Sequence, residues 1–123
     1  MVQSKALIRR KLRRRNRSKK TSRFHPNRLR LVISRSLKHF EAQIIDDSKE
    51  HTLISISTKE KEIKSLTKKQ HNKTEVCKLI GKELAKRAKK ANVGSLVLDR
   101  NGLFYHGRVK AFTESARKHG LEL

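Results

Sequence analysis

The sequence has little of what stabilises secreted, zinc-binding or membrane-spanning proteins. Cys77 is the only cysteine among 123 residues, so no internal disulfide can form. The longest unbroken apolar run is three residues, whereas about 20 are needed to cross a bilayer. Six histidines are scattered without metal-ligand spacing, which argues against a zinc site. Aromatic residues make up only 4% of the chain, too few for a platform on which bases stack.

Acidic residues are also scarce, and the basic residues that outnumber them are unevenly placed. Lys and Arg number 33 against 11 Asp and Glu, which gives a net charge of +22. Residues 1–30 hold thirteen basic side chains and no acidic one. This surplus favours a nucleic-acid partner. A solvated tail, a nuclear-import patch, an anionic lipid surface and an organellar targeting segment are alternatives. The absence of an apolar helical face beside the charges argues against the lipid surface.

We expect residues 1–27 to form a basic N-terminal arm. Arg9, Arg13 and Arg17 stand four residues apart, as do Arg10 and Arg14. A helix stacks these like charges, and each such pair opposes an isolated helix by roughly 0.2–0.5 kcal/mol. We therefore predict an arm that is disordered or frayed when free and helical when RNA phosphates neutralise it.

Residues 28–123 predict a compact α+β domain that begins after the only proline. Apolar residues alternate over 29–34, 40–44 and 53–57, which predicts three antiparallel strands at hairpin spacing. Residues 59–72 are polar and without a sustained apolar period, so we expect a mobile loop with room for one helical turn.

The second half of this domain predicts an α-β-α succession. Val76, Ile80, Leu84 and Ala88 recur every four residues, which is typical of an amphipathic helix that Asn72 or Thr74 caps. A buried strand over 95–98, a tight turn at 101–102, a continuation over 103–105 and a last helix over 109–118 follow. The fold class is therefore α+β: a small mixed sheet with helices packed on it.

Residues with catalytic chemistry are few. Cys77 falls on the apolar face of the predicted helix, so we expect a buried side chain rather than a nucleophile. Asp46, Asp47, Glu60 and Asp99 are the only carboxylates to weigh as a two-metal nuclease site, and ordinary positions in turns and at strand ends explain them equally well. We therefore expect no enzyme activity, no cofactor, no metal and no small-molecule substrate.

Two stretches carry polar groups suited to RNA. Residues 34–39 place several hydrogen-bond donors in a turn between two strands, where they can bind phosphates and 2′-hydroxyls of RNA. A solvated hairpin turn without an RNA contact explains the same residues equally well. In residues 99–109 a turn feeds a helix N-terminus, which attracts anions, beside His106 and Arg108. Tyr105 either joins this site or covers the core.

Five segments together resemble the bacterial large-subunit ribosomal protein family numbered eighteen, over nearly the whole chain. The run Tyr-His-Gly-Arg-Val at 105–109 is the most specific element. That run belongs to the segment that also holds Asp99-Arg100, Gly102 and Ala111. The other four segments are Arg35-Ser36 with Lys38-His39, Ala42 to Asp47, Ser57-Thr58 with Glu60-Lys61, and Arg117 with Gly120-Leu121. The Lys-rich outer face of the helix and residues 64–73 depart from the family's pattern, so no contact is assigned there.

The resemblance implies a structural, non-enzymatic component of the large ribosomal subunit in the cytoplasm. It implies binding to 5S ribosomal RNA and its attachment to 23S ribosomal RNA in the central protuberance, beside neighbouring ribosomal proteins and away from membranes. The implied RNA-binding residues are Arg9, Arg10, Arg13, Arg14, Arg15 and Arg17 in the arm, with Arg35, Ser36, Lys38, His39, Tyr105, His106 and Arg108 in the body. The alternative is a basic nucleoid-type protein that binds duplex DNA.

Overall fold

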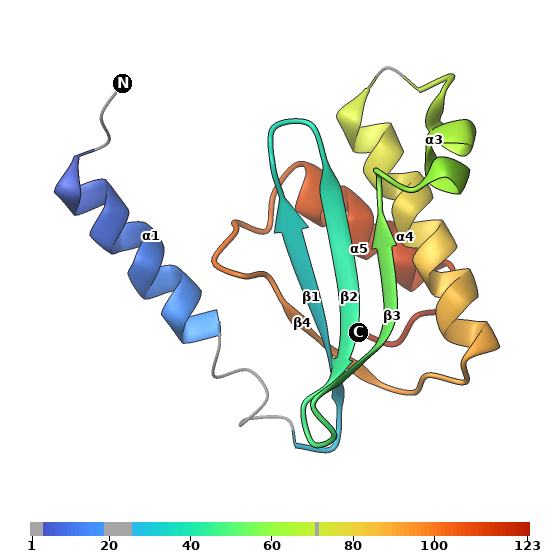
Figure 1. Cartoon of the computed structure of the whole chain (residues 1–123), viewed down its shortest axis with the longest axis horizontal. Helices are drawn as coiled ribbons and strands as arrows, with labels where there is room; N and C mark the ends of the chain where they lie inside the picture. The colour runs from blue at the N-terminus through green and yellow to red at the C-terminus, as the bar shows by residue number, and fades with distance from the viewer. Residues whose placement is uncertain (1–3, 19–25, 71) are drawn as a thin grey trace.

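The computed structural model describes residues 4–18, 26–70 and 72–123, and these form four helices and one four-stranded sheet. In chain order the elements are α1 (Lys5–Ser18), β1 (Leu29–Arg35), β2 (Phe40–Asp46), β3 (His51–Ser57), α3 (Lys61–Thr67), α4 (Lys73–Lys90), β4 (Leu96–Asp99) and α5 (Arg108–Lys118). Figure 1 shows a two-layer body in which α4 and α5 cover one face of the sheet, with α1 standing outside it.

The sheet is mixed, with strand order β3-β2-β1-β4. β2 pairs antiparallel with both β1 and β3, as their hairpin spacing predicts. β4 pairs parallel with β1, opposing Leu29 to Leu96 and Leu31 to Leu98. The predicted succession of three antiparallel strands and then α-β-α is confirmed, and the return through α3 and α4 gives β4 its parallel direction.

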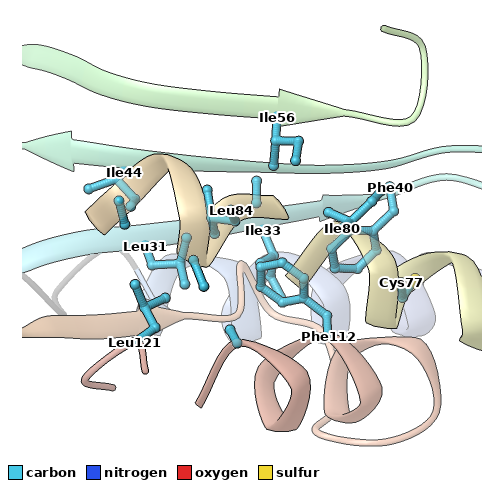
Figure 2. Packing of buried hydrophobic residues seen from close by; sticks show 14 of the residues in the cluster. Leu31, Ile33, Phe40, Ile44, Ile56, Cys77, Ile80, Leu84, Phe112 and Leu121 are labelled. Carbon is cyan, nitrogen blue, oxygen red and sulfur yellow. The ribbon is translucent and has the colours of Figure 1, made fainter. Parts of the chain in front are cut away.

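The core lies between the sheet and the pair α4 and α5, as Figure 2 shows. Alternate strand residues such as Leu31, Ile33 and Ile44 point into it, because successive side chains in a strand face opposite sides. Ile80 and Leu84 of α4 enter from the helix layer and are fully buried. The four-residue spacing in the sequence therefore marks the buried face of α4 correctly.

The two covering helices approach each other closely at Gly81. A Cβ atom built there lies 2.6 Å from the carbonyl oxygen of Phe112 and 3.1 Å from Cβ of Ser115. Ser115 Oγ donates to the carbonyl oxygen of Lys78 at 2.6 Å, which ties α5 to α4 beside the glycine. The absence of a side chain at position 81 thus allows α4 and α5 to approach each other at backbone distance.

Two local predictions are wrong. Residues 61–67 form the two-turn helix α3 rather than a loop, because Ile63 is buried in the core and holds the segment against the body. Residues 103–105 do not form a strand after the 101–102 turn. The turn itself is present, with positive φ at Asn101 and Gly102 and a bond from the Leu103 amide to the Arg100 carbonyl oxygen.

Helix α1 contacts the loop after β4 through its C-terminal end. Ser18 Oγ accepts a hydrogen bond from the Gly102 amide at 3.1 Å, and the Arg14 guanidinium lies 4.5 Å from the centre of the Phe104 ring. None of the residues of α1 is fully buried. The prediction that the arm becomes helical only on RNA remains a prediction, and residues 19–25 of the arm lie outside the described part of the chain.

Candidate nucleic-acid interface

The turn between β1 and β2 is held by its own polar groups. The Ser36 amide donates to the His39 carbonyl oxygen at 2.9 Å, and the His39 amide donates to Ser36 Oγ at 3.0 Å. Both strands end at this turn, so Lys38 is left exposed at its tip. Ser36 therefore stabilises the turn, and it is also a candidate for contact with RNA.

The His39 ring is positioned by a residue of the neighbouring strand end. Nδ1 of His39 lies 3.0 Å from Oγ1 of Thr58, and the same hydroxyl accepts a hydrogen bond from the Phe40 amide. Because Phe40 is buried, this hydroxyl fixes the ring relative to the core. The ring is thereby held against a rigid support.

Arg108 joins the start of α5 to this turn. Its Nη1 donates to the Ser36 carbonyl oxygen at 3.0 Å, across 72 positions of sequence. The N-cap of α5 is Gly107, with φ of 60° and no side-chain cap. Helix N-termini carry free amides and partial positive charge. The predicted anion-receptive helix start therefore lies beside the predicted turn.

Residues of the α3 and α4 region complete a basic pocket at this place, with a volume of about 290 Å³. Lys73 Nζ donates to the Leu37 carbonyl oxygen at 2.6 Å and so closes one side. No acidic side chain is among the residues that line the pocket: Lys38, His39, Phe40, Thr58, Lys64, Thr67, Gln70, Lys73, Val76, Cys77 and Arg108. The geometry suits a phosphate group, since donors surround it and nothing negative opposes an anion.

Cys77 contributes an apolar wall to this pocket. It is buried, as its place on the helix predicts. Burial raises the pKa of its thiol to about 11, because the apolar surroundings disfavour the thiolate. The side chain is therefore neutral at pH 7 and inert as a nucleophile.

The sequence-based interpretation missed part of this pocket. Thr58, Lys64 and Lys73 line it, although no RNA contact was assigned to residues 64–73. The charges of Lys64 and Lys73 are visible in the sequence, but the position of Lys64 opposite the β1–β2 turn depends on α3. Helix α3 is signalled in the sequence only by Ile63, which is a single buried residue.

The arginines of α1 form a second basic surface. Arg9, Arg10, Arg13, Arg14 and Arg17 fall within about 140° of the helix circumference at 3.6 residues per turn, whereas Arg15 falls outside that arc. All six side chains are exposed except Arg14, which is half-buried. The first turn of α1 holds no acidic residue. The helix thus presents one continuous basic face.

Four predicted body residues do not line the pocket: Arg35, Ser36, Tyr105 and His106. Ser36 acts through the turn and through its contact with Arg108 instead. Arg35 is exposed at the end of β1, although its charge acts on the same Cys77 thiol as that of Arg108. The hydroxyl of Tyr105 accepts a hydrogen bond from Arg117 at 3.4 Å, so this ring neither covers the core nor joins the turn. His106 is exposed in the same loop.

The carboxylates that were weighed as a nuclease site have other partners. Arg30 donates to Asp47 at 3.0 Å through both Nε and Nη2, and to Asp99 at 2.9 Å through Nη1. Glu60 accepts from Arg87 at 2.7 Å, and this contact lowers the pKa of its carboxyl. Within residues 4–18, 26–70 and 72–123, no three potential ligands are grouped to hold a metal ion. In those same ranges no helix is long and apolar enough to span a bilayer.

Comparison with known proteins identifies the class of protein to which the chain belongs. A family model described as ribosomal L18 of archaea, bacteria, mitochondria and chloroplast matches residues 5–123. Fold, charge and this match together define a structural, non-enzymatic ribosomal protein.

Individual relatives carry the name large ribosomal subunit protein uL18. The Thermus thermophilus protein is 46% identical over 122 residues, 99% of both chains. The Bartonella henselae protein is 48% identical over 122 residues, 98% of both chains, and the Dictyoglomus turgidum protein is 48% identical over 97 residues, 79% of both. The chain belongs to the ribosomal L18 family, whose members are proteins of the large ribosomal subunit.

Proposed function

We propose that the chain binds 5S ribosomal RNA and helps attach it to 23S ribosomal RNA in the central protuberance. The observation that carries the proposal is the convergence of Lys38, His39 and Arg108 on one acid-free pocket, from elements far apart in sequence. Neighbouring large-subunit proteins are proposed as further partners.

The two basic surfaces have different tasks in this proposal. The pocket side chains are held by Ser36, Thr58 and the start of α5, so they offer donors in fixed positions to phosphates and 2′-hydroxyls of a folded RNA. The exposed arginines of α1 and the rest of the 1–27 arm neutralise phosphates, with little dependence on sequence. The body at 28–123 supplies selectivity, and the arm supplies affinity.

A selectivity measurement tests the proposal. Affinity for 5S RNA, an unrelated structured RNA and duplex DNA is measured near 0.15 M salt for the full chain and for K38Q and R108Q. Loss of a charge-assisted hydrogen bond of about 1.5 kcal/mol corresponds to a roughly tenfold weaker Kd for 5S RNA. We expect a smaller loss on the other two nucleic acids, since the fixed donors match one RNA surface.

The control variant is K82Q, which also removes one charge but lies on the exposed face of α4 outside the pocket. We expect it to bind 5S RNA almost as tightly as the unaltered chain. Circular dichroism of each variant verifies that it is folded. Equal affinity of the unaltered chain for 5S RNA and duplex DNA would contradict the proposal and favour a nucleoid-type DNA-binding protein.

A further inference from the structure

A second cleft lies between the C-terminal end of α1 and the loop that follows β4. Its volume is about 440 Å³. The residues that line it are Arg14, Arg17, Ser18, Leu98, Arg100, Gly102, Leu103 and Phe104. Three of these carry a guanidinium and none is acidic. The neighbouring Asp99 carboxylate is turned to Arg30 and to the Asn101 amide.

The shape of the cleft is fixed from both sides. Ser18 Oγ accepts the Gly102 amide at 3.1 Å, and the Arg14 guanidinium stacks 4.5 Å from the centre of the Phe104 ring. Gly102 has a φ of 78°, and a Cβ there would lie 3.0 Å from the Arg15 amide nitrogen. A glycine at this turn therefore allows α1 to sit directly against the loop.

Arg14 is left with an unsatisfied donor in this arrangement. Its Nε is buried and has no hydrogen-bond partner among the described residues. Buried donors in proteins are nearly always paired, because leaving one unmade is costly. The guanidinium lies over the Phe104 ring, and its Nε has no acceptor in this arrangement. Because Nε is closed to solvent, a ligand oxygen pairs with it only after a small shift of the side chain.

The net electrostatics of the cleft favour an anion. The C-terminus of α1 points its partial negative charge of about half a unit toward the loop, which opposes an anion. The three positive charges of the guanidinium groups exceed this partial negative charge several-fold. The Arg100 side chain is exposed, so a ligand can reach it from solvent. Guanidinium groups bind phosphate oxygens in a fork of parallel hydrogen bonds.

We propose that this cleft is a binding site for one phosphate group of an RNA backbone, held jointly by Arg14, Arg17 and Arg100. The identity of the ligand as RNA rests on the proposed function, whereas the recognition of phosphate does not. The site differs from the pocket at the β1–β2 turn, with which it shares no lining residue. A single phosphate there joins α1 to the body in the bound state.

The first experiment titrates the full chain with inorganic phosphate and follows the Gly102 amide and the Arg14 Nε–H signals by NMR. We expect saturable shifts of both signals, and we expect R100Q to abolish them. K82Q is the matched control, because it removes one positive charge from the exposed face of α4 outside the cleft and leaves the titration unchanged. Absence of saturable shifts, or equal shifts in R100Q, overturns the proposal.

The second experiment identifies the source of the phosphate. A single-stranded RNA oligonucleotide is compared with the same sequence carrying uncharged methylphosphonate linkages. The charged strand shifts the two signals and the uncharged strand does not. Equal shifts with both strands mean that a base is recognised instead of a phosphate, and this overturns the proposal.

A double-mutant cycle with 5S RNA then measures whether the arginines share one phosphate. R14Q and R100Q are each expected to weaken binding about tenfold, and the double variant to fall short of the product of both effects by at least about threefold. K82Q with R100Q is expected to be multiplicative within about twofold. Multiplicative effects for R14Q with R100Q contradict a shared phosphate.

The outcomes also separate this proposal from the proposed function. A chain that binds inorganic phosphate in the cleft but does not prefer 5S RNA retains the site and loses the assigned RNA. A chain that prefers 5S RNA but shows no phosphate shifts retains the function and loses the site.

Discussion

The substitution Gly81→Ala tests whether contact between helix backbones positions the start of α5. The added Cβ lies 2.6 Å from the Phe112 carbonyl oxygen, and this backbone atom moves only if α5 moves. Overpacking a tight contact costs up to about 3 kcal/mol, while replacing glycine in a helix interior returns about 1 kcal/mol of helix propensity. The expected net loss of stability is therefore roughly 2 kcal/mol.

Thermal unfolding followed by circular dichroism measures this effect. For a domain of this size a loss of roughly 2 kcal/mol lowers Tm by about 8 °C. The control is Gly94→Ala, since a Cβ there meets nothing within 4 Å and the backbone is not in the left-handed region. We expect that control to be neutral or slightly stabilising.

Binding provides an independent measurement of the same displacement. If α5 is pushed outward, Arg108 loses its 3.0 Å contact with the Ser36 carbonyl oxygen. Affinity for 5S RNA then falls in Gly81→Ala at temperatures well below its Tm, but not in Gly94→Ala. A Tm for Gly81→Ala equal to or above that of the unaltered chain would refute the reasoning, because α4 and α5 would then have room for the methyl group.

Three further predictions concern interactions that hold the body together. Arg87 lowers the pKa of Glu60, so the pair stabilises the fold fully above the ordinary carboxyl pKa of 4.5. This stabilisation is lost as the pH falls through the lowered pKa of Glu60. The difference in Tm between the unaltered chain and Glu60→Gln should therefore be largest near neutral pH and vanish at strongly acidic pH. Arg30→Ala leaves the Asp99 carboxylate, 4% exposed, without its cation, and should cost roughly 3 kcal/mol in urea unfolding; an unchanged midpoint contradicts this. Ile80→Ala empties a fully buried position and should cost roughly 2–5 kcal/mol; the urea midpoint falls while the slope stays unchanged if only packing is lost.

Sequence periodicity predicted the elements that have one buried face. The alternation in β1, β2 and β3 and the four-residue spacing in α4 each reflect a side buried against the other layer. Helix α3 escaped prediction because it is two turns long and buries one residue, Ile63. No periodic signal can develop over so short an element.

The candidate site was predictable by residue type but not by arrangement. The donors of the 34–39 turn and of Arg108 are visible in the sequence, yet their meeting depends on the parallel addition of β4 and on the approach of α5 to α4 at Gly81. The strand expected over 103–105 does not form, and the reason is again an arrangement that the sequence does not reveal. The 101–102 turn is present, but Phe104 stacks against Arg14 of α1 instead of entering the sheet.

The late position of β4 in the chain has a consequence for folding during synthesis. This strand completes the sheet beside β1, whose paired residues lie 67 positions earlier, as in Leu29 and Leu96. The Leu96 amide also donates a hydrogen bond to the Glu122 carbonyl oxygen at 2.8 Å. Closure of non-local contacts is slow compared with local hairpins and helices. A growing polypeptide therefore carries its basic N-terminal segment outside the synthesis machinery before β4 and the C-terminal residues can complete the sheet.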